Sequence, residues 1–350
     1  MKSLPDYNSL ANTGKITRDG KNAPLLQAYL SIPQEASDHH AGLDPATIAE
    51  FLLLLDQLPD DILVQQEHRT LTGPNPEISG LRQIVRYQQE LVLLAAPEEV
   101  VRETERLLRL VEILDCRILS ELLVQVSLVE ISLSPIAGRL HDLQKRMATL
   151  ADRLDRLSQR LEVHLTNAFI GEFVLANHTC ENPAATRQAM GLFAPDSLWD
   201  DLMWGPQMRA GRGPLLSREM AWIQMTRLHP TPADLVSNAR RISRESQDLR
   251  RWIPTETLSL QLMGVVPTVL NMTAKCQLRL QLMAAEVHGT TWPIDAFDPS
   301  GKPLRRFERD GVLMGAYTVY EDGFDNGGDK KKDRYFPLYG PLELPVSTTP

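Results

Sequence analysis

An acidic loop near the C-terminus carries the residues with the clearest chemistry. Residues 321–333 include Asp322, Asp325, Asp329 and Asp333, with glycines between them. Hard divalent cations prefer several oxygen ligands, and glycine lets a short backbone curl so that such oxygens converge. Neighbouring carboxylates would also repel one another without a compensating cation. The loop therefore predicts a calcium site formed by these four aspartates.

The same loop has a plainer interpretation as a solvated hairpin loop. Lys330, Lys331 and Lys332 lie within it and could balance the acidic side chains. Its spacing also differs from the EF-hand pattern, which requires D-x-[DN]-x-[DN]-G and a glutamate at the twelfth position. Calcium and a simple loop thus both remain open at this point.

Short strands are expected to position the loop. Residues 304–307 and 312–320 have strand-like composition and are joined by an Arg-Asp-Gly turn at 309–311. A further short strand is predicted at 335–339, directly after the loop. We therefore expect residues 289–350 to form a small antiparallel β-element.

The preceding residues, 44–288, are predicted to form a helical body. Its clearest signal is an apolar seam that repeats in alternating steps of three and four over about three heptads. We expect one helix over about 136–168, separated at Ser134-Pro135 from an apolar helix before it. The two helices together should form a coiled-coil-like hairpin. Dimerisation through the seam is the alternative. The seam residues are Leu140, Leu143, Met147, Leu150, Leu154, Leu157 and Leu161.

Other segments complete the expected architecture. Residues 1–43 are polar and predict an irregular N-terminal arm, whereas 181–216 are rich in Pro, Gly and Trp and predict a packed loop. Residues 255–288 predict a long apolar helix that Pro267 kinks or divides and Gly289 ends. The fold class is therefore mainly α: a long-helix bundle with a small C-terminal β-element.

Composition excludes some function classes. The 350 residues are 43% hydrophobic and carry a net charge of −8, which argues against general nucleic-acid binding. Three cysteines are too few and too dispersed for a structural zinc cluster. Cys180 and Cys276 could form one disulfide in an oxidising compartment, or all three thiols, Cys116 included, could be free.

Catalytic signatures are lacking in the sequence. It contains no H-E-x-x-H, G-x-S-x-G or Walker pattern. His141 and His164 are predicted to be surface residues of the heptad helix. Cys116 follows Asp115 in an apolar segment, which predicts an inert buried thiol because an acidic neighbour disfavours a thiolate. We therefore expect a non-enzymatic protein.

One alternative and one membrane question remain. The alternative is a helical ligand-binding or hydrolase-like domain with a cleft around Trp199 to Arg212. The apolar segment 118–136 carries Glu121 and Glu130, so a buried helix is expected there rather than a membrane span. No apolar signal segment follows the N-terminal lysines, so any membrane attachment would need an anchor that this sequence does not include.

The C-terminal block resembles the calcium-loop region of the major pseudopilins of type II secretion. The matching features, in the same order, are His288-Gly289, Trp292-Pro293, the D-P-S-G-K-P-L segment from Asp298, the Tyr317 strand leading to D-G, and the closing Asp329 and Asp333. It is also similar to the ends of uncharacterised helical bacterial envelope proteins, which carry D-P-F-[ST]-G-K-P-L-R-Y and Y-S-V-G-x-D-G-x-D-D-G-G.

The resemblance implies a location and a cofactor. It implies an extracytoplasmic protein of the periplasm or envelope, with protein partners there or self-association, and calcium as a cofactor. The sequence departs from the pattern at Tyr320, where a glycine is usual, and at Asn326, which replaces an aspartate. More than 250 residues precede the block, so the chain is not a plain pseudopilin.

Overall fold

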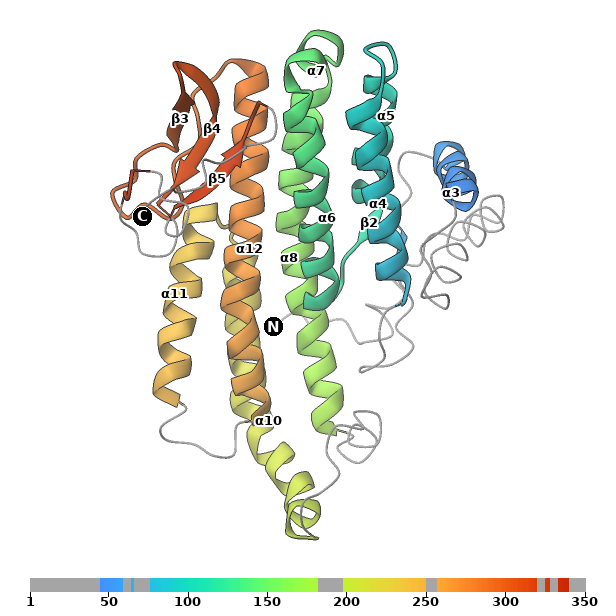
Figure 1. Ribbon diagram of the computed structural model, residues 1–350. Helices are drawn as coiled ribbons and strands as arrows, with labels where there is room; N and C mark the ends of the chain where they lie inside the picture. Colours follow the sequence, from blue (N-terminus) through green and yellow to red (C-terminus); the bar gives the residue numbers. More distant parts are fainter. Residues whose placement is uncertain are drawn as a thin grey trace, which may run out of the picture.

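Long helices make up most of the chain (Figure 1). The structure is a computed structural model that describes residues 45–58, 64–65, 76–181, 198–249, 257–319, 325–327 and 333–339. The helices in these ranges are α3 (Pro45–Gln57), α4 (Pro76–Leu94), α5 (Val100–Glu112), α6 (Leu119–Gly138), α7 (Leu140–Arg146), α8 (Leu150–Glu181), α10 (Leu198–Thr226), α11 (Pro232–Leu249) and α12 (Thr257–His288).

The strands form two small sheets. β1 (Val64–Gln65) pairs in parallel with β2 (Leu114–Asp115). At the C-terminal end, β3 (Arg305–Arg309), β4 (Val312–Thr318) and β5 (Arg334–Pro337) form an antiparallel sheet in the order β3-β4-β5. The mainly α class with a small C-terminal antiparallel sheet is therefore confirmed.

The bundle is built around α6, α8 and α12, which run side by side through its middle (Figure 1). α12 packs against α11, α8 and α6, while α10 packs along α8 and α4 packs against α5 and α6. α6 is apolar enough and long enough to cross a membrane by length and composition alone, and most of it is buried inside the bundle.

The predicted apolar seam is buried, but it is not one helix. All seven seam residues are at most 2% exposed, from Leu140 to Leu161. α7 ends at Arg146, Met147 has a non-helical backbone, and α8 begins only at Leu150. The prediction of a continuous helix over about 136–168 is therefore wrong. The turn between α7 and α8 lets α8 return beside α6 while the leucines of both helices stay in the core; coiled-coil geometry stays a prediction.

Pro135 is predicted to separate two helices and Pro267 to kink or divide one, and neither proline divides its helix. α6 continues through Pro135 to Gly138, and the chain leaves helical geometry at Arg139 rather than at Ser134-Pro135. α12 likewise continues through Pro267 as one helix. A proline removes one backbone hydrogen bond, and burial of neighbours such as Leu133 and Val266 at 0% exposure offsets that loss.

Residues 198–216 are also helical rather than a packed loop. They belong to α10, which runs through Pro206 and Pro214 and packs along α8. The low helix propensity of the Pro and Gly residues predicts a loop here, and packing against a neighbouring helix overrides that preference. The remainder of the predicted loop, 182–197, lies outside the described residues, as does the N-terminal arm at 1–43.

The C-terminal hairpin follows its local sequence closely. Asp310 and Gly311 have φ values of 54° and 75°, the left-handed pair required by a tight two-residue turn. Arg305 lies opposite Tyr317 and Ala316 opposite Phe336 in the ladder. Gly289, with a φ of 65°, ends α12 as predicted.

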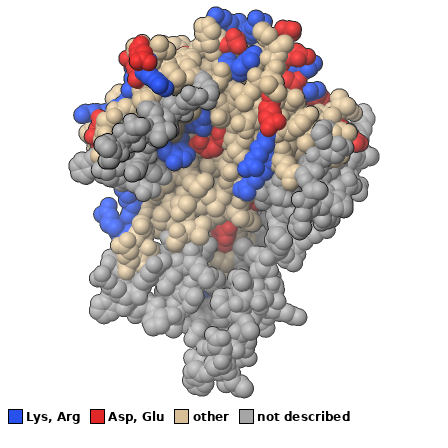
Figure 2. All heavy atoms as spheres, viewed as in Figure 1, with Lys and Arg blue, Asp and Glu red and all other residues tan. Residues whose placement is uncertain are grey.

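The C-terminal sheet shares its core with the helices. Phe297, Leu304, Phe336 and Leu338 are each at most 4% exposed and belong to the same apolar cluster as the bundle residues. On the face in Figure 2, basic and acidic side chains intermix over the end of the molecule that carries the sheet, and the middle of that face is largely uncharged.

Candidate functional site

The predicted calcium ligands are only partly within the described residues. Asp325 and Asp333 are described, whereas Asp322 and Asp329 lie outside. Asp333 is buried directly before β5, and Asp325 is exposed on the loop. Across the described ranges, no group of three or more His, Cys, Asp or Glu side chains is arranged to hold a metal ion.

Arg305 at the start of β3 gathers three carboxylates. Its guanidinium donates from Nη2 to Asp298 Oδ2 at 2.6 Å, from Nε to Asp325 Oδ2 at 2.8 Å and from Nη1 to Asp295 Oδ2 at 3.2 Å. The Arg305 side chain is 16% exposed, while those of Asp295 and Asp298 are 0% and 5% exposed. A buried carboxylate needs a compensating charge, and Arg305 supplies it.

Asp295 is the most enclosed member of this group. Its Oδ1 accepts hydrogen bonds from the Phe297 N–H and the Thr318 hydroxyl, and its Oδ2 accepts one from the Val319 N–H at 3.1 Å in addition to Arg305. This carboxylate therefore joins the turn after α12 to the end of β4.

Hydrogen bonds to the ionised forms lower the pKa values of two of these carboxyl groups. Burial alone would raise the pKa of Asp298, but the hydroxyl and N–H of Ser300, together with Arg305, outweigh it and lower the pKa to about 2. The Gly327 N–H, and then Arg305, hold the pKa of Asp325 below its ordinary value. Both residues are therefore anionic at neutral pH.

One predicted calcium ligand, Asp325, already has partners within the protein. Asp325 directs Oδ2 to Arg305 and receives the Gly327 N–H and the Tyr317 hydroxyl on Oδ1, so both of its oxygens are already engaged. A cation at Asp325 would therefore share this carboxylate with Arg305. Calcium at the loop stays a prediction, with Asp322, Asp329 and Asp333 as the remaining ligands.

A second polar cluster lies inside the bundle. Gln125 of α6 accepts from the Cys116 thiol at 3.2 Å, and its Oε1 lies 2.6 Å from His164 Nδ1. His164 Nε2 is 3.9 Å from Asp115 Oδ1. His164 is 3% exposed, so its prediction as a surface residue is wrong. It lies on the inner side of α8 because Gln125 provides a hydrogen-bond partner in the core.

The electrostatics of this cluster oppose nucleophilic catalysis. Burial, with Glu121 and Asp115 adding to it, raises the pKa of the Cys116 thiol well above its ordinary value. Burial, with the nearby Arg160 charge adding to it, lowers the pKa of His164 to about 4. The thiol is thus protonated and the imidazole neutral at pH 7, and Cys116 is buried as the sequence predicts.

The two acidic side chains of the apolar segment have structural partners. Glu121 Oε2 accepts from the backbone N–H groups of Arg117 and Ile118, which caps α6. Glu130 accepts from Arg279 of α12 at 2.8 Å. Glu121 therefore stabilises the start of its own helix, whereas Glu130 connects α6 to α12.

The cysteines are unpaired. Cys116, Cys180 and Cys276 are each buried as a free thiol, so the alternative with a Cys180–Cys276 disulfide is not realised. The physical reason is their placement: Cys276 lies in the main apolar core, and Cys180 packs in a separate small cluster with Ala176 and Leu215.

In the range from Trp199 to Arg212, where the alternative cleft is predicted, Arg212 is the one residue whose side chain the structure describes. Arg212 of α10 donates to Asn177 at 2.7 Å and to Glu181 at 2.6 Å, both on α8. The side chains of 198–211 lie outside the described residues. Arg212 therefore serves the contact between α8 and α10.

The sequence motifs located this site without revealing its chemistry. Asp298 and Arg305 belong to the D-P-S-G-K-P-L-R segment, yet their ion pair was not expected. Asp295 was missed as well. The spacing of seven residues between an aspartate and an arginine flanking a Pro-Gly turn is the signal that could have indicated such a pair.

Comparison of the chain with protein-family models, with curated proteins and with solved structures gave no match. The resemblance of the C-terminal block to pseudopilins therefore stays a prediction that its motifs alone carry.

Proposed function

We propose that the chain is a non-enzymatic structural or interaction protein of the cell envelope, with a pseudopilin-like C-terminal element held rigidly on a helical bundle. The observation that carries this proposal is the shared core. Phe297, Phe336 and Leu338 pack in the same buried cluster as the helices, so the β-element is attached to the bundle through a common apolar core.

Polar contacts support the same attachment. The Trp292 indole N–H donates to Glu286 of α12 at 2.9 Å, the Tyr339 hydroxyl donates to the same carboxylate, and Arg240 of α11 donates to the Phe297 carbonyl at 3.2 Å. Bonds from both ends of the β-element thus reach two helices. A rigid element of this kind suits a protein that presents a fixed surface to an assembly.

The interior chemistry favours a non-catalytic role. A nucleophile needs an activated form near neutral pH, and burial keeps the Cys116 thiol protonated. His164 is neutral and enclosed, with its Nδ1 directed to Gln125. These groups act as a hydrogen-bonded core contact between α6, α8 and the segment before α6.

The envelope location is tested by fractionation of the cells that encode the protein. The gene, with its own upstream sequence and a C-terminal epitope, should place the chain in the periplasmic or membrane fraction, accessible to protease after the outer layers are opened. Recovery in the cytosolic fraction, with full protection from protease, would contradict the location.

The structural role is tested by assembly. In detergent extracts run on native gels, the wild-type chain should migrate in a species larger than its monomer. Arg305→Met, which loosens the β-element, should shift it to smaller species, while the matched Arg309→Met, on an exposed side chain of the same strand, should not. A wild-type chain that migrates only as a monomer contradicts the proposal.

A further inference from the structure

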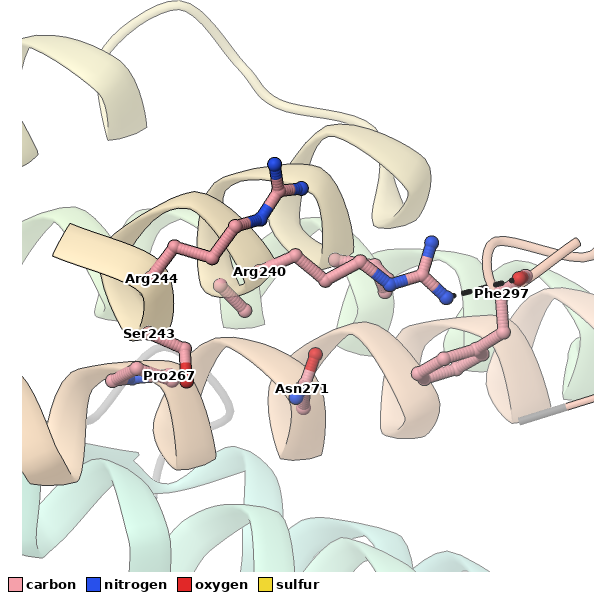
Figure 3. Close-up of a pocket in the computed structure, with 8 residues that line it drawn as sticks. Arg240, Ser243, Arg244, Pro267, Asn271 and Phe297 are labelled. Carbon is pink, nitrogen blue, oxygen red and sulfur yellow. Dashed lines mark hydrogen bonds between the residues drawn. The ribbon is translucent and has the colours of Figure 1, made fainter. Parts of the chain in front are cut away.

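A groove opens between α11 and α12 beside the β-element. It has a volume of about 340 Å³ and is lined by Val236, Ala239, Arg240, Ser243 and Arg244 from α11, Pro267 and Asn271 from α12, and Phe297. Figure 3 shows the side chains of Arg240 and Arg244 extending from neighbouring turns of α11, with Asn271 and Pro267 on α12 opposite. The size is at the lower end of the range for small-molecule sites.

Two arginines contribute to this groove without an acidic partner. Arg240 and Arg244 are four residues apart, so they lie on one face of α11, where two like charges destabilise a helix. Arg240 donates to the Phe297 carbonyl at 3.2 Å, which is a neutral acceptor. Within the part of the chain that the structure describes, no carboxylate pairs with either guanidinium. An anion in the groove would relieve this repulsion.

Asn271 adds a hydrogen-bonding group opposite the arginines. Its Oδ1 is shielded from solvent and has no hydrogen-bond partner among the described residues. A buried amide group without a partner costs about 1–3 kcal/mol. Because an amide carries both an oxygen acceptor and an N–H₂ donor, Asn271 can accept from a ligand hydroxyl or donate to an oxyanion. The Ser243 hydroxyl lines the same groove.

The remaining lining is apolar and firmly held. Val236 and Ala239 are 1% exposed and Phe297 is 2% exposed, so the floor of the groove belongs to the shared core. Pro267 completes the α12 side. A ligand would therefore meet a rigid apolar floor, with cationic and amide groups beside it.

We propose that this groove binds a small organic oxyanion, a carboxylate or phosphate attached to a short apolar group. The guanidinium of arginine matches both oxyanions in bidentate geometry. Arg240 and Arg244 would hold the anionic end, Asn271 and Ser243 would bond its polar atoms, and Phe297 and Pro267 would contact the apolar part. This adds a ligand to the structural role proposed for the chain.

The test is calorimetric titration of the full chain with phenyl phosphate, benzoate and inorganic phosphate. We expect phenyl phosphate to bind more tightly than inorganic phosphate because the apolar floor contributes. Arg244→Gln should weaken binding by about tenfold, since it removes a charge-assisted bond. Arg241→Gln removes the same charge three residues before Arg244, from a side chain that is bonded to Asn238 and does not line the groove, and should leave binding unchanged.

Several outcomes would overturn the proposal. If none of the probes binds at concentrations up to about 10 mM, the dissociation constants lie above the millimolar range, and the site is rejected. An equal loss in R241Q and R244Q means that the effect is general surface charge. Arg240→Gln serves as the second variant and is interpreted only after its melting temperature is matched to that of wild type. Binding to vesicles of phosphatidylglycerol in phosphatidylcholine, without binding to phenyl phosphate, would assign the arginines to a lipid surface instead.

Discussion

Arg305 Nη2 lies 2.6 Å from Asp298 Oδ2, and this ion pair closes the turn that leads from α12 into the C-terminal sheet. The same guanidinium reaches Asp295 and the loop residue Asp325. Arg305 therefore compensates two buried carboxylates and one of the four aspartates, Asp325, that the sequence predicts as metal ligands.

Replacing Arg305 should destabilise the protein strongly. Arg305→Met leaves Asp295 and Asp298 buried without their cation, a change that costs about 3–5 kcal/mol for buried pairs. Urea denaturation measures the free energy of unfolding. Arg309→Met is the control, because that side chain is 53% exposed, and it should change the free energy by less than about 0.5 kcal/mol. Similar small losses in both variants would contradict the role of Arg305.

The Asp298 carboxyl should make stability depend on acid. Its pKa is about 2 in the folded state and about 3.9 when unfolded, so the unfolded chain binds the proton first. This contribution is complete above about pH 4 and is lost as the pH falls toward 2. Asp298→Asn should therefore be less stable than wild type at pH 7, with a difference that shrinks in acid. Asp310→Asn, on a 93% exposed side chain, should show no such convergence.

Glu219 on α10 should make stability depend on pH in the opposite direction. It is 1% exposed, neither carboxyl oxygen has a hydrogen-bond partner within the described ranges, and burial, with Glu172 adding to it, raises its pKa to about 9. The folded state keeps a proton that the unfolded state releases above about pH 4.3, so stability falls as the pH rises from there toward 9.

Glu219→Gln removes this titration. The variant should be more stable than wild type at pH 8, and its advantage should grow between pH 5 and 9 by at most about 1.4 kcal/mol per pH unit. Melting temperatures across that range measure it. Glu245→Gln, at an exposed position of α11, is the control. A pH profile of E219Q parallel to that of wild type would show that Glu219 is ionised in the folded state.

Gly171 on α8 is required by a close backbone approach. A Cβ at this position would lie 1.8 Å from the Arg117 carbonyl oxygen, so Gly171→Ala should force α8 away from the segment before α6 and cost more than about 2 kcal/mol. Gly264 in α12 is exposed with nothing within 4 Å. Gly264→Ala should instead stabilise by about 0.5–1 kcal/mol. Equal effects of the two substitutions on the urea midpoint would contradict this packing.

Calcium at the acidic loop predicts a melting temperature that rises with excess calcium and falls with EGTA, because a ligand of the native state alone stabilises it. Asp322→Asn and Asp329→Asn should abolish the shift. An unchanged wild-type midpoint under both conditions rejects the site and leaves Arg305 as the cation of the element.

The sequence indicated where the cluster around Arg305 lies, but it did not indicate which charged groups pair there. The motif around Asp298 and the loop at Asp325 marked the correct region. Sequence spacing could not indicate that Arg305, twenty residues before Asp325, would bond it, because that contact depends on how β3 and the loop are brought together. The groove with Arg240 and Asn271 had no sequence signal, since its two sides come from separate helices.

The sequence by itself determined the features that local chemistry controls. Apolar periodicity and capping determined the helical class and the burial of the seam, Gly289 determined the end of α12, and Asp310-Gly311 determined the hairpin turn. These depend on backbone preferences of a few neighbouring residues.

Only the tertiary structure decided the features that depend on distant partners. It placed His164 in the core against Gln125, carried α6 through Pro135, kept Cys180 apart from Cys276, and set Arg305 among its aspartates. Packing energy between elements exceeds the local cost of a proline or a buried polar group when a partner is supplied. That partner lies elsewhere in the chain, and only folding brings the two together.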